Sequence, residues 1–232
     1  MATVSLIIGQ SGSGKSASLR NFKREDIIVF SLEKTRLPFR NNFHLCSLAN
    51  EHYIDRYDII RDNMAKLCGT KKVFVIDDAD YLMLFEVTAR NSEKSYSKWG
   101  DISARFVELK NFVNSLPDDV TVYYIMHAQQ NSDGRWCAND IGKFIKERIG
   151  TIEAMFENVF FATIVEGKHV FETNSDGDST AKTSMEMFNA KSEHYVDNDL
   201  KAIDERIREY YGIPQLEEIK AQKANKQEKG DK

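Results

Sequence analysis

Residues 9–16, which read GQSGSGKS, decide the fold of this chain. They follow the apolar run 4–8 (VSLII) and precede the helix-compatible segment 17–20 (ASLR). A G-x-x-x-x-G-K-[ST] pattern between a strand and a helix is typical of a phosphate-binding loop, because its glycines permit a tight turn in which several backbone N–H groups point into one concavity. The sequence therefore predicts a loop that binds the phosphates of a nucleotide.

Each residue type in this loop has a predicted role. Lys15 can reach the β- and γ-phosphates and act in catalysis, Ser16 can place its hydroxyl on Mg²⁺, and the N-terminus of the next helix adds positive partial charge. We therefore expect ATP and Mg²⁺ as ligands. A chance glycine-rich turn is the alternative, and the flanking strand and helix disfavour it. The residues predicted to contact the nucleotide are Gly9, Gln10, Ser11, Gly12, Ser13, Gly14, Lys15, Ser16 and Ala17.

Length, charge and cysteine content restrict the class of protein. The chain has 232 residues, of which 41% are hydrophobic, and this suffices for one large α/β domain. Its net charge of −4 argues against a generally basic nucleic-acid-binding surface but allows a local basic groove. Cys46, Cys68 and Cys137 form no C-x-x-C pair, so neither a disulfide framework nor a zinc site is predicted. We expect a cytoplasmic protein with reduced thiols, no signal peptide and no membrane span.

Apolar runs alternate with amphipathic segments along the chain. Strands are expected at residues 4–8, 26–32, 43–48, 73–76, 120–126, 159–165 and 169–173, and helices at 16–22, 52–67, 80–90, 101–116, 141–157 and from 197 to 211. This alternation predicts an α/β domain over residues 1–212, with a mostly parallel sheet flanked by helices and an antiparallel hairpin at its edge. Residues 213–232 are charged and nearly without large apolar side chains, so we expect a disordered tail there.

A second motif lies about sixty positions after the loop. Residues 72–78 read KVFVIDD, an apolar strand that ends in two acids, which is the form of a Walker B element. Ligands of parallel sheets bind outside the carboxyl ends of the strands, so a carboxylate here would lie beside the phosphate loop. We assign Asp77 to Mg²⁺, held through the water shell of the ion. The alternative is a strand that simply ends in a polar turn.

Hydrolysis also needs a group that orients or deprotonates water. Asp78 directly follows the metal-binding acid, at the position where clamp-loader and helicase-type ATPases carry a glutamate. Glu33 follows the second strand, where a carboxylate would approach the γ-phosphate by sheet geometry. We favour Glu33 over Asp78. The alternative for Glu33 is that it only begins a polar loop.

The strand 122–126 ends in His127, Ala128, Gln129 and Gln130. A polar side chain at this strand end can sense the γ-phosphate and transmit its presence to the next loop. His127 and Gln129 are both candidates, and Gln129 is also a predicted catalytic residue. A histidine that only makes structural hydrogen bonds is the alternative.

Two polar stretches mix cations with aromatic rings, which is the combination that follows a phosphate backbone while stacking bases. They contain the polar loops 91–100 and 131–140, and solvated loops with ordinary surface lysines are the alternative. The first stretch carries Arg90, Lys94, Tyr96, Lys98 and Trp99, and the second carries Arg135, Trp136, Lys143, Lys146 and Arg148.

These motifs occur in the order found in RecA-like ATPase cores, and over residues 4–190 the chain resembles the minimal RecA-like ATPases of phages. That group includes single-strand-annealing recombinases. The resemblance implies a RecA-like P-loop fold, ATP hydrolysis, assembly into homo-oligomeric rings or filaments, and binding of single-stranded DNA in recombination or replication. Lys182 resembles a cation that some such proteins extend to the γ-phosphate of a neighbouring subunit. Further segments that carry the resemblance are residues 34–40, 141–145, 173–178 and 181–184.

Two other functions fit the same motifs. A nucleoside or nucleotide kinase would use the same loop with an arginine-rich lid, and the best lid candidate, residues 131–148, contains only Arg135 and Arg148. A nucleotide-gated interaction module would hydrolyse slowly and exchange partners. No N-K-x-D segment that would read guanine is evident, so we expect ATP rather than GTP.

Overall fold

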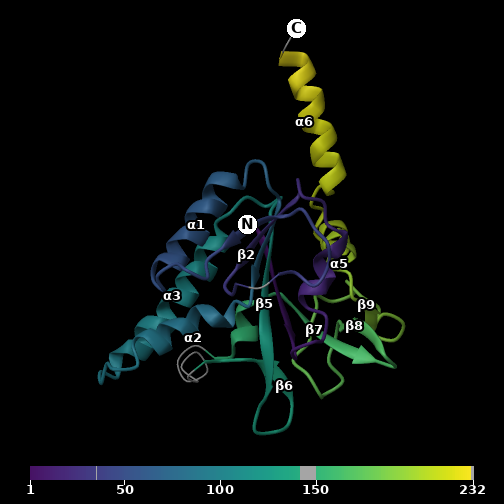
Figure 1. The fold of residues 1–232 in the computed structure, drawn as a ribbon. Coiled ribbons are helices and arrows are strands. Elements are labelled where there is room, and N and C mark those ends of the chain that lie inside the picture. The colour runs from purple at the N-terminus through teal and green to yellow at the C-terminus, as the bar shows by residue number, and fades with distance from the viewer. Residues whose placement is uncertain (35, 142–149, 231–232) are drawn as a thin grey trace.

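A mixed sheet runs through the centre of this computed structural model, which describes residues 1–34, 36–141 and 150–230 (Figure 1). Within the described residues it has nine strands in the order β3-β2-β4-β5-β1-β7-β8-β9, and β6 pairs with β5 outside this path. The strands are β1 Thr3–Gly9, β2 Ile27–Ser31, β3 His44–Ser47, β4 Val73–Asp77, β5 Thr121–Gln130, β6 Trp136–Ala138, β7 Asn158–Val165, β8 Lys168–Glu172 and β9 Tyr195–Asp197.

Along this path neighbouring strands are parallel from β3 through β2, β4, β5 and β1 to β7, whereas β8 and β9 add an antiparallel edge. Strand β6 also pairs antiparallel with β5. The predicted α/β class, with a mostly parallel sheet and an antiparallel edge hairpin, is therefore confirmed. Strand β1 lies between β5 and β7, with Gly9 opposite His127 on one side and Ala162 on the other. Because these strands are parallel, their carboxyl ends meet at one edge of the sheet.

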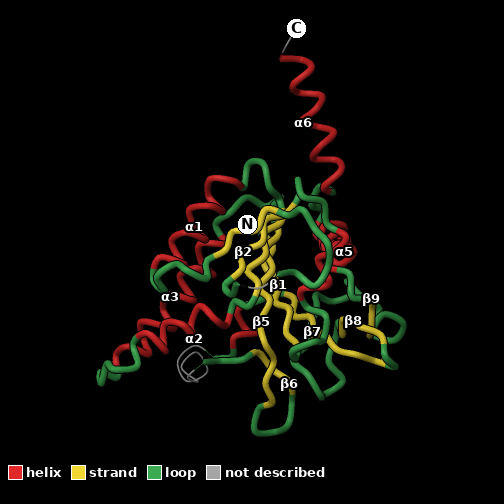
Figure 2. The backbone as a smooth tube through the Cα atoms, in the orientation of Figure 1, coloured by secondary structure: helices red, strands yellow, loops and turns green. Residues whose placement is uncertain are grey.

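Helices cover both faces of the sheet (Figure 2). Alternate strand residues point to opposite faces, so Leu6 and Ile8 contribute to a core beneath α1, α2 and α3, and Ile7 contributes to a core beneath η1, α5 and the start of α6. The helices are η1 Ser16–Asn21, α1 Asp55–Leu67, α2 Asp80–Ala89, α3 Ser97–Asn114, η2 Ile152–Met155, α5 Leu200–Tyr211 and α6 Leu216–Gly230, of which η1 and η2 are 3₁₀ helices. None of the helices in the described ranges combines the length and the apolar character needed to cross a bilayer.

Both expected polar loops are partly ordered. Helix α3 begins at Ser97, four residues before the expected start, because Lys98 is buried and Trp99 packs against the core. Strand β5 continues to Gln130 and pairs with β6, so the segment 131–140 forms a hairpin. Of the expected helix 141–157, residues 142–149 lie outside the described residues, and the remainder forms only η2.

The carboxyl-terminal segment differs from the expected disordered tail. Helix α6 begins at Leu216 and extends away from the sheet (Figure 1). Its first turns dock because Leu216 and Ile219 are buried and Lys220 forms an ion pair with Asp26 at 2.8 Å. Two apolar residues three positions apart, together with this ion pair, therefore attach the charged helix to the domain.

A buried polar network lies at the amino ends of the central strands. Asp204 and Arg208 of α5 are fully buried, with 2.6 Å between Arg208 Nε and Asp204 Oδ2. The hydroxyl groups of Thr121 and Tyr123 donate to Asp204 Oδ1 at 2.6 and 2.7 Å. Both charges are thus compensated where the helix crosses the start of β5.

Candidate functional site

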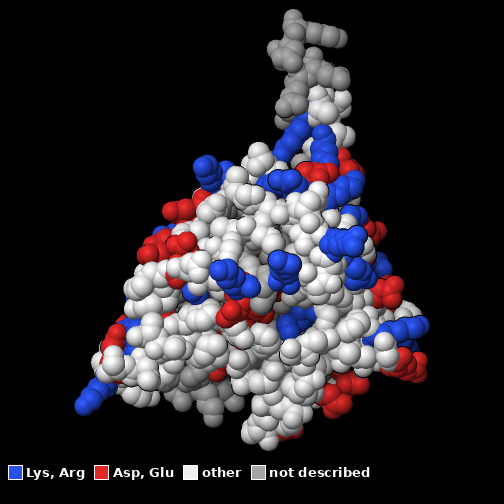
Figure 3. Space-filling model, viewed as in Figure 1, with Lys and Arg blue, Asp and Glu red and all other residues white. Residues whose placement is uncertain are grey.

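A cavity of about 430 Å³ lies at the carboxyl ends of the parallel strands. The ends of β2 and β4, the segment after β2, and single residues of β3, β5 and β8 complete its wall. Basic and acidic side chains lie together near the middle of the face drawn in Figure 3. The predicted loop residues that line the cavity are Ser11, Gly12, Gly14, Lys15, Ser16 and Ala17.

Three glycines determine the shape of the loop. Gly12 and Gly14 have φ angles of 79° and 97°, which a side chain disfavours. A Cβ on Gly9 would lie 2.5 Å from Ser13 Oγ, and a Cβ on Gly14 would lie 2.9 Å from His169 Nδ1. The conformation of the loop therefore favours glycine at all three positions, by backbone conformation at Gly12 and Gly14 and by close contacts at Gly9 and Gly14.

Lys15 lies within the loop and is 7% exposed. Its Nζ donates to the carbonyl oxygens of Gly9 and Gln10, each at 2.9 Å. Burial lowers the pKa of Lys15, although the carboxylates of Asp78, Asp80 and Asp77 oppose this shift. The ammonium is thus placed at the cavity wall, where it can move to an anionic ligand.

Ser16 and Asp77 meet although they are 61 positions apart in sequence. Ser16 Oγ donates to Asp77 Oδ1 at 3.1 Å. Burial, together with the neighbouring charge of Asp78, raises the pKa of Asp77 to about 6. A hydroxyl and a carboxylate at this distance suit Mg²⁺, which prefers oxygen ligands, and a cation would compensate the two adjacent acids.

Asp78 lines the cavity next to Asp77. Its φ of 59° is left-handed, a conformation that non-glycine residues rarely adopt and that is common at functional sites. Burial raises the pKa of Asp78, and His127 opposes the shift from an Nε2 that lies 3.8 Å from Asp78 Oδ1. This carboxyl group can accept a proton from a water molecule in the cavity.

Asp80 is a site residue that the sequence analysis missed. It is fully buried at the start of α2 and lies 3.2 Å from His127 Nδ1 through its Oδ2. This hydrogen bond raises the pKa of His127, and the imidazole also stacks on Tyr81 with ring centroids 5.4 Å apart. The spacing of Asp77, Asp78 and Asp80 at a strand end was the available signal.

His169 was also missed. It lies on β8, lines the cavity and has its Nδ1 3.0 Å from the carbonyl oxygen of Ser13. The antiparallel edge therefore contacts the phosphate loop directly. No local pattern around His169 indicates this role.

The other two predicted catalytic residues, Glu33 and Gln129, do not line this cavity. Glu33 is half-buried after β2 and does not line the cavity, although its charge contributes to the raised pKa of Asp78. Gln129 is exposed, donates to the carbonyl of Ala138 at 3.4 Å and lines a separate cavity of about 530 Å³. Asp78, and not Glu33, lines the cavity among the two acids predicted to activate water. His127, and not Gln129, lines it among the two residues predicted to sense the γ-phosphate.

The stretches predicted to bind DNA use many of their side chains internally. Arg90 forms ion pairs with Glu86, Glu93 and Asp101, and Lys98 Nζ donates to two backbone carbonyls. Trp136 stacks on Phe161 with ring centroids 6.1 Å apart. The candidates Lys143, Lys146 and Arg148 lie outside the described residues. Lys182 is exposed beside the amino end of β7, where its backbone pairs with Val159.

Comparison with known proteins finds no matching family model and no curated protein of similar sequence. Interpretation of the site therefore depends on its own geometry.

Proposed function

We propose that this chain is a Mg²⁺-dependent P-loop ATPase of the RecA-like class. One observation carries the proposal: Lys15 and Ser16 of the loop line the same cavity as Asp77 and Asp78, with 3.1 Å between Ser16 Oγ and Asp77 Oδ1. Two motifs that are distant in sequence thus form one site of the composition that a magnesium nucleotide requires.

The residues divide the chemistry as follows. The loop N–H groups and Lys15 would bind the phosphates, and Ser16 and Asp77 would hold Mg²⁺, an ion that would supply charge neutralisation at the phosphates. Asp78 orients the attacking water. His127, oriented by Asp80, detects the γ-phosphate because it faces both Asp78 and the cavity.

Strand order supports the RecA-like assignment. Strand β5 separates β4 from β1, so the acids of β4, the sensor of β5 and the loop after β1 follow one another along the same sheet edge. The motif resemblance to phage ATPases extends the proposal to single-stranded DNA in recombination or replication, and to homo-oligomers. The β5–β6 hairpin, which carries Arg135 beyond His127, is the element that would respond to nucleotide.

Calorimetric titration of the full chain with ATP and MgCl₂ tests the proposal. We expect one nucleotide per chain, at least about tenfold weaker binding by Lys15→Ala, and unchanged binding by Lys66→Ala, a matched exposed lysine on α1. The absence of nucleotide binding by the wild-type chain would refute it.

Product analysis separates the ATPase from a kinase. Free phosphate that forms without an acceptor supports hydrolysis, whereas a phosphorylated nucleoside or nucleotide supports the kinase. Single-stranded DNA should raise the rate of phosphate release, and added salt should reduce this stimulation. A rate that DNA does not change would contradict the DNA-binding part of the proposal alone.

A further inference from the structure

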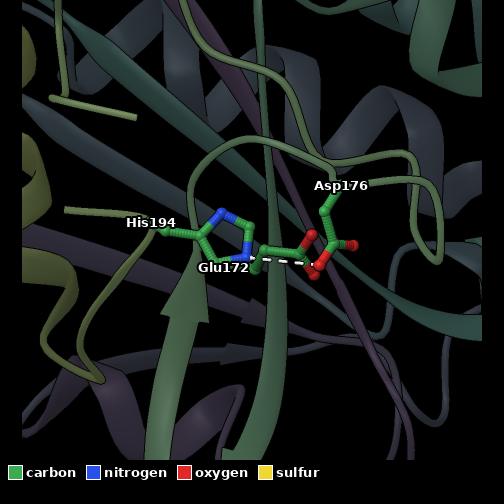
Figure 4. A group of neighbouring side chains, drawn as sticks. All are labelled: Glu172, Asp176 and His194. Carbon is green, nitrogen blue, oxygen red and sulfur yellow. Dashed lines mark ion pairs between the residues drawn. The ribbon is translucent and has the colours of Figure 1, made fainter. Parts of the chain in front are cut away.

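A second cluster of ligand-type side chains lies at the antiparallel edge of the sheet (Figure 4). Glu172 ends β8, Asp176 lies in the loop that follows, and His194 directly precedes β9. One ligand atom from each residue lies within 4.8 Å of the other two, and His194 Nε2 lies 3.9 Å from Asp176 Oδ2. None of the three lines the nucleotide cavity, so the cluster is separate from the proposed ATPase site.

Glu172 is the unusual member of this cluster. Its side chain is 4% exposed, and its Oε1 has no hydrogen-bond partner among the described residues. Burial raises the pKa of Glu172, with Ser179 and His194 opposing the shift. A buried carboxylate oxygen without a donor is costly, and a bound cation would compensate it. Figure 4 shows the carboxylate facing the other two side chains.

The backbone places these side chains together independently of any ligand. The N–H of Thr173 donates to the carbonyl of His194 at 2.9 Å, which joins β8 to the segment before β9. Ser175 Oγ accepts from the N–H of Gly177 at 3.0 Å and donates to the carbonyl of Ser179 at 2.6 Å, which orders the turn around Asp176. Three segments of the chain therefore converge at one point.

We propose that Glu172, Asp176 and His194 bind a divalent transition-metal ion of the zinc type. One imidazole and two carboxylates are a zinc donor set, with water at the fourth position. The imidazole distinguishes this site from the all-oxygen Mg²⁺ site of the phosphate loop. Tetrahedral zinc requires donor atoms about 3.4 Å apart. The side chain of Asp176 is 62% exposed and can therefore close the remaining gap.

A metal ion here would stiffen a surface that contacts the β5–β6 hairpin. The N–H of Trp136 donates to the carbonyl of Asp178 at 2.8 Å, and Arg135 Nε donates to the carbonyl of Gly177 at 2.9 Å. Both acceptors belong to the loop that contains Asp176. The proposed ion would thus restrain the hairpin from the side opposite to its connection with His127.

Titration of the EDTA-treated full chain with zinc chloride, without nucleotide, tests this proposal. We expect one zinc-binding event that raises the Tm, and a loss of affinity of at least about tenfold in both Glu172→Gln and Asp176→Asn. Asp176→Asn changes an exposed side chain, so it preserves the fold even if substitution of the buried Glu172 does not. His44→Ala, on an exposed histidine of β3, and Asp77→Asn, in the nucleotide site, are the controls that should retain the affinity.

The outcomes are distinct. Zinc affinity that falls in Asp176→Asn and persists in the two controls supports the site. Equal affinity in wild type and Asp176→Asn, or no zinc binding by the wild type, would overturn it. Neither result depends on ATP hydrolysis, because zinc binding is measured directly and the proposed function has its own titration.

Discussion

Buried charged side chains are paired at one end of the parallel sheet and lie beside like charges at the other end. At the amino ends, Asp204 and Arg208 are fully buried, but each contacts a partner of opposite charge and further hydrogen-bonding groups. At the carboxyl ends, Asp77 and Asp78 are adjacent acids, burial raises the pKa of each, and they border an open cavity with Lys15. The first arrangement is complete without a ligand, whereas the second places two adjacent acids at a cavity where the proposed Mg²⁺ would compensate them.

This contrast teaches how to distinguish structural from functional charge in an α/β protein. Removal of one partner of a buried ion pair leaves the other charge uncompensated and destabilises the fold, whereas adjacent buried acids without such a partner reduce stability until a cation binds. Substitutions at the two ends should therefore change stability with opposite signs.

The largest change in stability is expected at the amino ends. Arg208→Met leaves Asp204 buried without its ion pair and should reduce the free energy of unfolding by about 3–5 kcal/mol. Arg206→Met, two residues earlier on α5, removes a half-exposed ion pair with Glu193 and a contact of the guanidinium with the Phe188 ring, and should cost only about 1 kcal/mol. Urea denaturation measures the free energy of unfolding of both variants. Equal losses would contradict the distinction between the buried and the half-exposed ion pair.

Asp77→Asn should act in the opposite direction. Because the pKa of Asp77 is raised from about 3.9 in the unfolded chain to about 6, the folded state binds the proton more tightly, and stability falls as pH rises from about 4 through 6. Without nucleotide, Asp77→Asn should be about 3 kcal/mol more stable than wild type at pH 8 and similar to it below pH 4. Denaturation curves at both pH values measure this.

The same substitution should abolish function while it stabilises the fold. Mg²⁺-dependent ATP turnover should fall by at least about 100-fold, because the metal loses its carboxylate. Asp62→Asn, on an exposed face of α1, should change neither stability nor turnover. Turnover that survives in Asp77→Asn would assign the metal to another residue.

Two glycines with positive φ provide a smaller, matched test. Gly14 borders the phosphate cavity, and Gly212 ends α5 near the amino ends of the strands with a φ of 65°. Alanine at Gly212 meets no atom within 4 Å and should cost about 1 kcal/mol of stability through backbone strain alone. Alanine at Gly14 also approaches His169, so it should cost about 1 kcal/mol more and weaken ATP binding, as measured by denaturation and calorimetry.

The smallest effect is expected where α6 docks. Lys220→Ala removes the ion pair with the buried Asp26 and should reduce the free energy of unfolding by about 1 kcal/mol, with no effect on ATP binding. Lys66→Ala is again the control. If Lys220→Ala leaves the thermal midpoint unchanged, this ion pair contributes nothing to the stability of the domain.

Local patterns predicted the α/β class and the loop geometry, because each depends on neighbours in sequence. The positive φ angles of Gly12 and Gly14 and the position of Lys15 at the cavity follow from a motif whose conformation is set within a few residues. The pairing of Ser16 with Asp77 joins two such motifs that are 61 positions apart, and the expectation that parallel strands end at one edge of the sheet predicted that they lie together. The 3₁₀ form of η1 and the early start of α3 were not predicted, because tertiary packing decides such boundaries.

Residues that act across the sheet could not be found in this way. His169 reaches the loop only because β8 returns antiparallel along β7, and no periodicity encodes that return. Asp80 could not be found from local patterns for the same reason, because its role depends on the position of His127 on a different strand. The docked start of α6 depends on only two apolar residues, too few for a helical pattern to be distinguished from a disordered tail.

Strand β5 extends beyond the last residue that pairs with β1. Its pairing with β1 ends at His127, and Ala128, Gln129 and Gln130 continue as one arm of the hairpin with β6. Three strand residues span about 10 Å, so a rotation of about 10° at His127 would displace the end of β5 by about 2 Å. The proposed nucleotide site thus lies at the base of this arm, and the length of the arm would determine how far a change at a bound phosphate displaces the hairpin tip.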